Sequence, residues 1–433
     1  MPPRSRPGSR PPRPYAGATP TEVRAAPKLP LAPEHLRQRS LALPDDDAPL
    51  PQILVRSPTR HPFLFRKRLG TFDRRARHGD LVQLTLDTGE IFGYGLFNPR
   101  AEITVRLLTL GTEPPREEWW SSRLADAVAL RRDTLQLDAV TNACRLVHSE
   151  GDGMSGLVAD KFGDVLSIEV FGLAIYQRVD ALAAQLAGLC GAKHWVVRCA
   201  PTSLEHEGFH AEPYGSPGHP AHVTVTEFGT RFRIDLEHGH KTGFFCDQRD
   251  NRRAVAQLCT GKNVLDACCY TGGFAIQASV LGKAAEVTGV DLDEQAIETA
   301  RTNAKLNQQQ IRFVHGDAFP YLRDMQKNER AYDVIVLDPP KFIRSRDEIE
   351  EGRQKYFDLN RLAMQLVAPG GWLVTCTCSG LLGAREFQQT VSAAVPGNRR
   401  ARILNRTGAA PDHPIAANCL ETEYLQALWL KLD

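Results

Sequence analysis

The chain has 433 residues, too many for one small domain, and its 42% hydrophobic and 24% charged residues are typical of soluble proteins. No apolar run approaches the length of a membrane span, and the first residues lack the apolar segment of a signal peptide. The ten cysteines include no Cys-x-x-Cys pair, which argues against a disulfide framework or a zinc site and favours a reducing cytoplasm. Because the net charge is only +2, any nucleic-acid surface must come from local clusters of basic residues.

The first 50 residues are rich in proline and arginine and have no periodic apolar pattern. This composition predicts a disordered arm over residues 1–50. A basic arm can hold nucleic-acid phosphates loosely, but a dispensable extension explains the composition equally well.

Residues 51–111 carry strand and turn signals only, which predicts a small β module. Strands are expected at residues 52–55, 81–86, 91–94 and 103–108, with a hairpin turn at Asp87-Thr88-Gly89. Basic residues cluster before the second strand, close to three phenylalanines: Arg66, Lys67, Arg68, Arg74 and Arg75. Such a rim is a plausible RNA-binding surface, and the alternative is a barrel with a merely solvated basic face.

Residues 112–227 predict a middle α+β domain. Helices are expected at residues 117–137 and 179–189, and strands at residues 157–159, 165–170 and 195–198. The alternating segment 223–236 predicts a hairpin that closes this domain. Nothing in its composition indicates a particular chemistry.

A dense polar and aromatic segment, residues 238–249, precedes the last domain, which we expect over residues 228–433. His238 and His240 have no further ligand at a suitable spacing, so we do not expect a metal. We expect instead a lid that contacts cofactor or substrate through Lys241, Phe245 and Gln248.

Residues 263–291 predict a strand, a glycine turn, a helix and a second strand that ends at Asp291. In such βαβ units, a carboxylate in this place can accept hydrogen bonds from ribose hydroxyls. The turn lacks the Gly-x-Gly-x-x-Gly pattern that cradles a pyrophosphate, and Asp266 would repel phosphate. S-adenosylmethionine, with a ribose and a positive charge but no phosphate, fits better than a dinucleotide; an α/β unit without ligand is the alternative. The turn residues expected to contact it are Tyr270, Thr271, Gly272, Gly273 and Phe274.

Three further strands also end in residues that can bind ligands. Residues 311–314 lead to Asp317, residues 332–337 lead to Asp338, and residues 372–375 run into Cys376-Thr377-Cys378. The carboxyl ends of strands in an open α/β sheet share one crevice, so these residues, Asp266 and Asp291 should converge on one site. We expect Asp317 to accept the adenine amino hydrogens.

Several motifs together resemble the class I S-adenosylmethionine-dependent rRNA large-subunit methyltransferases, most closely the bacterial 23S rRNA 5-methylcytosine enzymes with an N-terminal PUA module. The motifs are Asp338-Pro-Pro-Lys-Phe, Tyr270-Thr-Gly-Gly-Phe, Thr377-Cys-Ser, His238-Gly-His-Lys-Thr-Gly, Asp247-Gln-Arg, Glu150-Gly-Asp-Gly, Ala410-Pro-Asp-His-Pro and His61-Pro-Phe-Leu-Phe. The resemblance covers residues 51–433. It implies an RNA-binding PUA domain at 51–111, the middle domain at 112–227 and a seven-stranded Rossmann-like methyltransferase domain at 228–433, with rRNA as the partner.

The resemblance also implies a nucleophilic cysteine. Cytosine C5 is a poor nucleophile, and addition of a thiolate to C6 activates it. Cys378 matches the family's nucleophile, whereas Cys376 is interpreted as a small buried residue. Other RNA 5-methylcytosine enzymes carry a second cysteine after the proline of the fourth-strand motif, where this chain has Lys341, so Asp338 becomes the preferred polar group beside the target base.

Two other functions remain open at this stage. One is methylation of another rRNA base atom, such as a guanine nitrogen, because Asp-Pro-Pro loops also serve amino-nitrogen methylation. The other is a non-catalytic RNA-binding factor in ribosome assembly. The target nucleotide and the oligomeric state, with a homodimer as one option, do not follow from the sequence.

Overall fold

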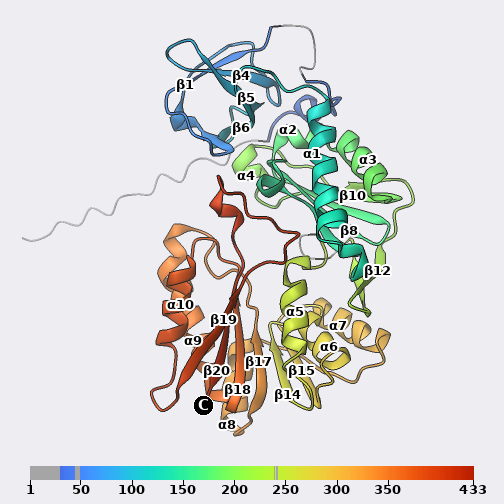
Figure 1. Cartoon of the computed structure of the whole chain (residues 1–433), viewed down its shortest axis with the longest axis vertical. Coiled ribbons are helices and arrows are strands. Elements are labelled where there is room, and N and C mark those ends of the chain that lie inside the picture. The colour runs from blue at the N-terminus through green and yellow to red at the C-terminus, as the bar shows by residue number, and fades with distance from the viewer. Residues whose placement is uncertain (1–29, 44–48, 238, 240–241) are drawn as a thin grey trace, which may run out of the picture.

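The structure is a computed structural model that describes residues 30–43, 49–237, 239 and 242–433. Figure 1 shows a small β module at one end, a middle α/β part, and a larger α/β part that contains the C-terminus. No helix in these described ranges is long and apolar enough to cross a membrane.

Residues 30–43 differ from the predicted disordered arm. Leu31, Leu41 and Leu43 are buried in the hydrophobic core that they share with the middle part. Arg39 pairs with Asp80 at 2.9 Å, which also fixes the segment to the β module. The prediction is therefore wrong for this stretch, because three apolar side chains find a core to enter; residues 1–29 and 44–48 lie outside the described ranges.

The β module is a six-stranded sheet in the order β2-β6-β5-β4-β1-β3. The four predicted strands are confirmed, and two strands of only three and four residues were not predicted. The strands are β1 Gln52–Val55, β2 Phe63–Phe65, β3 Leu69–Phe72, β4 Leu81–Thr85, β5 Ile91–Phe97 and β6 Ile103–Leu110. Fully buried side chains such as Ile53, Leu64 and Val105 fill its core.

The middle part is a five-stranded sheet, β11-β10-β9-β8-β7, covered by helices. The expected long helix is instead helix α1 followed by a π-helical turn at Leu130–Thr134. The strands are β7 Ala143–His148, β8 Leu157–Phe162, β9 Val165–Val170, β10 His194–Cys199 and β11 Tyr214–Gly215, and the helices are α1 Glu118–Ala129, α2 Leu173–Tyr176, α3 Val179–Cys190 and α4 Ser203–Glu207.

The predicted hairpin is confirmed as β12 His222–Glu227 and β13 Thr230–Asp235. Its inward side chains, Val225, Phe232 and Ile234, belong to the hydrophobic core of the last domain. The hairpin therefore joins the middle part to the last domain, where we had expected it to close the middle domain only.

The last domain is a seven-stranded sheet in the order β16-β15-β14-β17-β18-β20-β19. The first five strands in this order are parallel and the last two pair antiparallel. Its strands are β14 Asn263–Ala267, β15 Glu286–Asp291, β16 Arg312–His315, β17 Tyr332–Leu337, β18 Val367–Thr377, β19 Ala401–Thr407 and β20 Gln426–Leu432. Its helices are α5 Arg249–Ala256, α6 Gly273–Val280, α7 Glu294–Leu306, α8 Ala318–Lys327, α9 Ile349–Leu366 and α10 Ala384–Ala393.

The central strand β17 explains why this sheet was predictable. Val334, Ile335, Val336 and Leu337 are all at most 1% exposed, as expected for a strand covered on both faces. Helix α7 begins after Asp293, whose carboxylate caps it by accepting the Ala296 N–H at 3.0 Å.

Candidate active site

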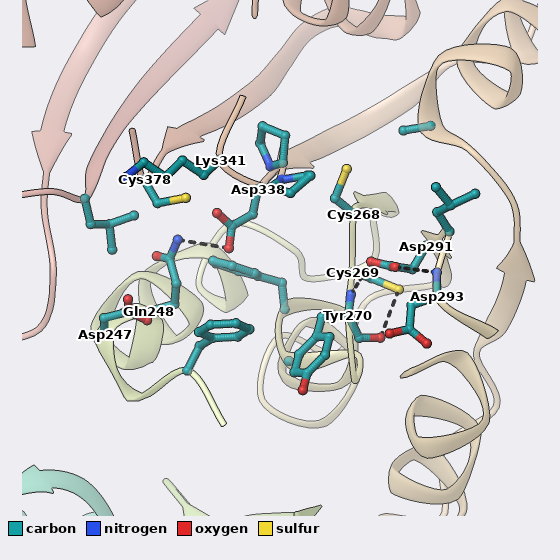
Figure 2. A pocket seen from close by; sticks show the side chains of 18 of the residues that line it. Asp247, Gln248, Cys268, Cys269, Tyr270, Asp291, Asp293, Asp338, Lys341 and Cys378 are labelled. Atoms are coloured by element: carbon teal, nitrogen blue, oxygen red, sulfur yellow. Dashed lines mark hydrogen bonds between the residues drawn. The ribbon is translucent and has the colours of Figure 1, made fainter. Parts of the chain in front are cut away.

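The carboxyl ends of the five parallel strands open onto one cavity of about 870 Å³, shown in Figure 2. This confirms the predicted convergence for Asp291, Asp317, Asp338 and Cys378. The residues that line it after the successive strands are Cys268–Thr271, Asp291–Asp293, Asp317–Phe319, Asp338–Phe342, and Cys378 with Gly380.

The turn after β14 has an unusual backbone. Gly272 has a φ of +83°, and a Cβ there would lie 3.0 Å from the Phe313 ring, so glycine is required. Cys268 and Tyr270 also have positive φ values, of 64° and 47°. Non-glycine residues hold such conformations where the surrounding structure compels them, often at functional sites. Gly273 lines the cavity, whereas Gly272 itself lies behind it.

Asp266 does not lie where the sequence analysis placed it. Its side chain is fully buried behind the turn, and its Oδ2 accepts the Ala275 N–H at 2.9 Å. Burial raises its pKa to about 8. Its predicted contact with the cofactor is therefore corrected to a role in holding the start of helix α6.

Asp291, at the end of β15, lines the cavity and is hydrogen-bonded to the turn after β14. Its Oδ2 accepts the Tyr270 N–H at 2.7 Å, and its Oδ1 accepts the Asp293 N–H at 2.9 Å. A carboxylate oxygen has a second lone pair, so both oxygens can accept a further hydrogen bond from a ligand. Asp317 also lines the cavity and caps helix α8 through the Phe319 N–H at 2.8 Å.

The two cysteines at the end of β18 have different surroundings. Cys378 is half-buried and lines the cavity, whereas Cys376 is fully buried. Burial raises the pKa of the Cys376 thiol well above its ordinary value, which keeps it protonated and a poor nucleophile. The prediction that Cys376 is covered and Cys378 faces the crevice is confirmed.

The neighbours of Cys378 are fixed by a buried tyrosine. The Thr377 hydroxyl donates to the Tyr356 hydroxyl at 2.8 Å, and the Tyr356 and Ser379 hydroxyls lie 3.0 Å apart. Because the residues on both sides of Cys378 are held in this way, the backbone that carries the thiol is fixed.

A chain of amides orients Asp338 in the same cavity. Gln248 donates from Nε2 to Asp338 Oδ2 at 3.0 Å, and Asn251 donates to Gln248 Oε1 at 2.7 Å. Phe245, from the predicted lid, packs edge-on against the Tyr270 ring at 5.1 Å. Lys241, His238 and His240 of the predicted lid lie outside the described residues, so the contacts predicted for Lys241 remain a prediction.

Several polar residues of the cavity were not predicted, among them Asp247, Glu421 and Tyr424. The Tyr424 hydroxyl donates to Asp247 Oδ2 at 2.6 Å, so the C-terminal loop closes one side of the cavity. The only signal for this loop in the sequence was the motif at residues 410–414, and it carried no information about which residues face the cavity.

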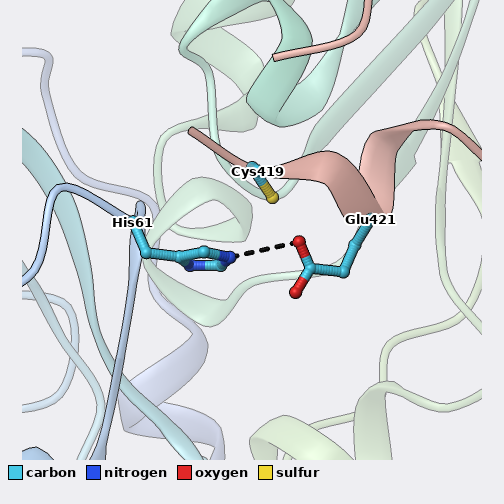
Figure 3. A group of neighbouring side chains, drawn as sticks. All are labelled: His61, Cys419 and Glu421. Atoms are coloured by element: carbon cyan, nitrogen blue, oxygen red, sulfur yellow. Dashed lines mark hydrogen bonds and ion pairs between the residues drawn. The ribbon is translucent and has the colours of Figure 1, made fainter. Parts of the chain in front are cut away.

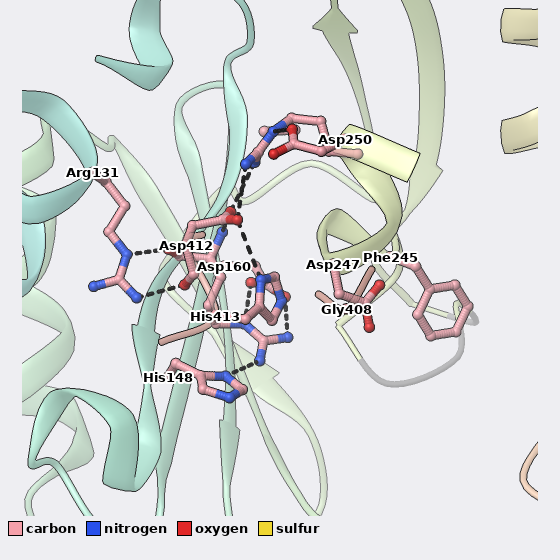
Figure 4. A network of polar contacts seen from close by, with 12 residues as sticks. Arg131, His148, Asp160, Phe245, Asp247, Asp250, Gly408, Asp412 and His413 are labelled. Carbon is pink, nitrogen blue, oxygen red and sulfur yellow. Dashed lines mark hydrogen bonds and ion pairs between the residues drawn. The ribbon is translucent and has the colours of Figure 1, made fainter. Parts of the chain in front are cut away.

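Asp412, from that motif, is the centre of a buried charge network, shown in Figure 4. Its carboxylate accepts two hydrogen bonds from Arg249, at 2.9 and 3.0 Å, and one from the Arg145 N–H at 2.9 Å. Its carbonyl accepts a hydrogen bond from Arg131 at 2.6 Å. The network therefore connects the middle part, helix α5 and the C-terminal loop.

His61 connects the β module to the same loop, as Figure 3 shows. His61, Cys419 and Glu421 lie close enough together to hold a metal ion. However, His61 Nδ1 accepts the Phe63 N–H at 3.0 Å, so in a neutral ring Nε2 carries the proton and donates to Glu421 at 3.2 Å. Metal bound at Nε2 would require the opposite tautomer, so hydrogen bonding explains the cluster better than a metal site does.

Comparison with protein families identifies this architecture. A family model described as S-adenosylmethionine-dependent methyltransferase matches residues 144–421, and one described as a PUA-like domain matches residues 56–110. The chain belongs to the S-adenosylmethionine-dependent methyltransferase family. The cofactor of this methyltransferase is therefore S-adenosylmethionine, as predicted.

Sequence similarity to known proteins covers most of the chain. The chain is 33% identical to ribosomal RNA large subunit methyltransferase I of Photobacterium profundum, over 86% of its own length and 94% of that protein. It is 35% identical to the protein of the same name from Aeromonas hydrophila, over 85% of this chain and 94% of that protein. A methyltransferase solved in complex with SAH has the same fold, with a TM-score of 0.74 and 19% identity over 88% of this chain and 99% of that one.

The cavity fits this cofactor. Asp291, Asp293, Asp317 and Asp338 line it, so it favours a cationic sulfonium ligand and disfavours phosphate. Asp291 can accept the ribose hydroxyls. Leu292 and Phe319 add apolar surface to the lining of the same cavity.

Replacing Asp291 with alanine is expected to weaken S-adenosylmethionine binding about a hundredfold, because two hydrogen bonds to a charged acceptor are lost. Titration calorimetry measures this directly. Asp324→Ala removes an exposed acid of helix α8 outside the cavity and serves as the control. Unchanged affinity in Asp291→Ala would remove Asp291 from the cofactor site.

Proposed function

We propose that this methyltransferase forms 5-methylcytosine in 23S ribosomal RNA through a covalent bond between Cys378 and C6 of the target base. The observation that carries the proposal is the half-buried thiol of Cys378 in the same cavity as Asp291. Relatives that cover most of the chain are named ribosomal RNA large subunit methyltransferases, which supports large-subunit rRNA as the substrate.

The proposed chemistry uses Cys378 as the nucleophile. Bound S-adenosylmethionine supplies an electrophilic methyl group. The Cys378 thiolate adds to C6, and the displaced electron pair makes C5 nucleophilic so that it can take the methyl group. S-adenosylhomocysteine is the leaving group of this transfer. A base then takes the C5 proton, its bonding electrons restore the C5–C6 double bond, and the thiolate departs.

Asp338 is the group proposed to bind the target base next to Cys378. Its Oδ2 is oriented by Gln248, and a carboxylate can accept hydrogen bonds from an exocyclic amino group. The base must leave its stack to enter the cavity, which costs a few kcal/mol for a paired nucleotide. A single-stranded or loop nucleotide is therefore the favoured target.

The PUA-like domain is proposed to bind RNA through part of its basic rim. Arg75 is paired with Asp73 at 2.7 Å, and the hydrogen bond from Arg75 lowers the pKa of Asp73 to about 2. Arg66 and Arg68 donate to Pro99 O at 2.7 Å and Ser57 Oγ at 2.9 Å. Within the described residues, Lys67 and Arg74 are exposed and have no ion-pair partner, so the proposal rests mainly on those two.

Mapping the product tests the proposed function. The full chain is incubated with S-adenosylmethionine and an unmodified 23S rRNA transcript, and the digested RNA is analysed by mass spectrometry. We expect one new 5-methylcytidine. A methylated guanosine, or binding of RNA without any methylation, would contradict the proposal.

A further inference from the structure

The loop that follows β17 begins inside the cavity and ends outside it. Asp338, Lys341 and Phe342 line the cavity, and residues 344–346 are exposed. A nucleotide that enters the cavity brings its flanking backbone past this loop. We propose that Lys341, Arg344 and Arg346 bind the RNA phosphates next to the target nucleotide; this inference rests on the proposed RNA substrate.

The loop is anchored firmly to the domain. Ile343 is fully buried, and its N–H donates to Ser379 Oγ at 3.3 Å. It packs so closely on helix α9 that a Cβ at Gly352 would lie 2.3 Å from Ile343 Cγ1. The Phe342 ring lies 4.9 Å from the Tyr356 ring, which also holds the residues around Cys378. Phosphate binding here would therefore order little of the backbone, which reduces its entropic cost.

The three cations of the loop form no ion pair with the described residues, although the backbone N–H of Arg344, and to a smaller extent its charge, lowers the pKa of Glu348. Within the described parts of the chain, Lys341, Arg344 and Arg346 have no ion-pair partner, and all three are exposed. Glu348 is committed to the backbone, because its carboxylate accepts the N–H groups of Arg344 at 2.7 Å and Ser345 at 3.2 Å. Arginine and lysine without partners are the side chains that phosphates bind best.

Helix α9, directly after the loop, shows the contrasting arrangement. Arg353 pairs with Glu350 at 3.5 Å, and Lys355 pairs with Glu351 at 2.7 Å. These two cations lie within a few residues of the loop but already have acidic partners. They provide a control pair of equal charge and similar position in the chain.

The double variant Arg344→Gln/Arg346→Gln tests the proposal against Arg353→Gln/Lys355→Gln. Binding of full-length 23S rRNA transcript is measured from low to physiological salt. The loop variant should bind about tenfold more weakly and reduce the salt slope of the binding constant by roughly 1.5, since each lost phosphate contact removes about 0.7 to 0.9. The KM for RNA should rise, while kcat and S-adenosylmethionine affinity should stay at wild-type values.

The control variant is expected to keep the wild-type slope. Equal slopes in wild type and the loop variant, or an equal decrease in the control, would overturn the phosphate site. If instead the wild type binds the transcript but yields no 5-methylcytidine, the proposed function fails separately, and the slope comparison still decides whether the loop binds phosphate.

Discussion

Replacing Cys378 with alanine is expected to abolish methyl transfer and leave S-adenosylmethionine affinity nearly unchanged. In the proposed mechanism the thiol acts on the base, so its loss removes the nucleophile without removing a contact to the cofactor. Transfer of a radioactive methyl group to unmodified 23S rRNA measures the first effect, and calorimetry measures the second. An N-methyltransferase would keep its activity in this variant.

Cys376→Ala is the matched control for Cys378→Ala. The two cysteines lie two residues apart, but Cys376 is fully buried against Leu425 and Ala427. Its loss should cost about 1 kcal/mol of stability and leave methylation intact. Low activity in a folded Cys376→Ala variant would show that the buried thiol contributes to catalysis.

RNA that carries 5-fluorocytosine at the target separates the two thiols chemically. Fluorine cannot leave C5 as a proton would, so the wild-type enzyme should remain bonded to the RNA. The adduct should also form with Cys376→Ala and be absent with Cys378→Ala. An adduct with Cys378→Ala would transfer the nucleophile's role to Cys376, and methylation of natural RNA without any wild-type adduct would favour nitrogen methylation.

The site was predictable from the sequence where strand order determines it. Asp291, Asp317, Asp338 and Cys378 each lie at or just after the carboxyl end of a parallel strand, and these ends meet at one edge of the sheet. Asp266 follows the same rule of spacing yet lies behind the turn. Asp266 lies inside β14, one residue before the strand ends, and its carboxylate accepts the Ala275 N–H of helix α6 instead of entering the cavity. The sequence does not show at which residue the strand ends.

The C-terminal side of the cavity was not predictable by the same reasoning. Tyr424 reaches Asp247 across 177 positions of the chain, and Asp412 reaches Arg249 across 163. Both pairs join distant segments of the last domain, and no local pattern encodes them. The same holds for residues 30–43, whose leucines are buried only because the middle part supplies a core.

Replacing Asp412 with asparagine is expected to destabilise the protein by roughly 3–5 kcal/mol, because the buried Arg249 guanidinium loses the charge that compensates it. Both side chains are at most 1% exposed. The change should appear as a lower urea midpoint, measured by fluorescence of the full chain. As a control, Asp133→Ala removes the partner of exposed Arg132 and should leave the midpoint nearly unchanged.

The effect of Asp412→Asn should also depend on pH in a defined direction. Burial alone would raise the pKa of Asp412, but His413 and Arg249 together hold it well below the ordinary value. A carboxyl with a lowered pKa stabilises the fold above its unfolded pKa of about 3.9, and this stabilisation is lost as the pH falls toward the folded value. The stability difference between wild type and Asp412→Asn should therefore be constant from about pH 7 to pH 5 and shrink below about pH 4. A stability difference that instead grew on acidification would show that Asp412 is not held as a carboxylate. Arg249 would then not be compensated by a negative charge on the C-terminal loop.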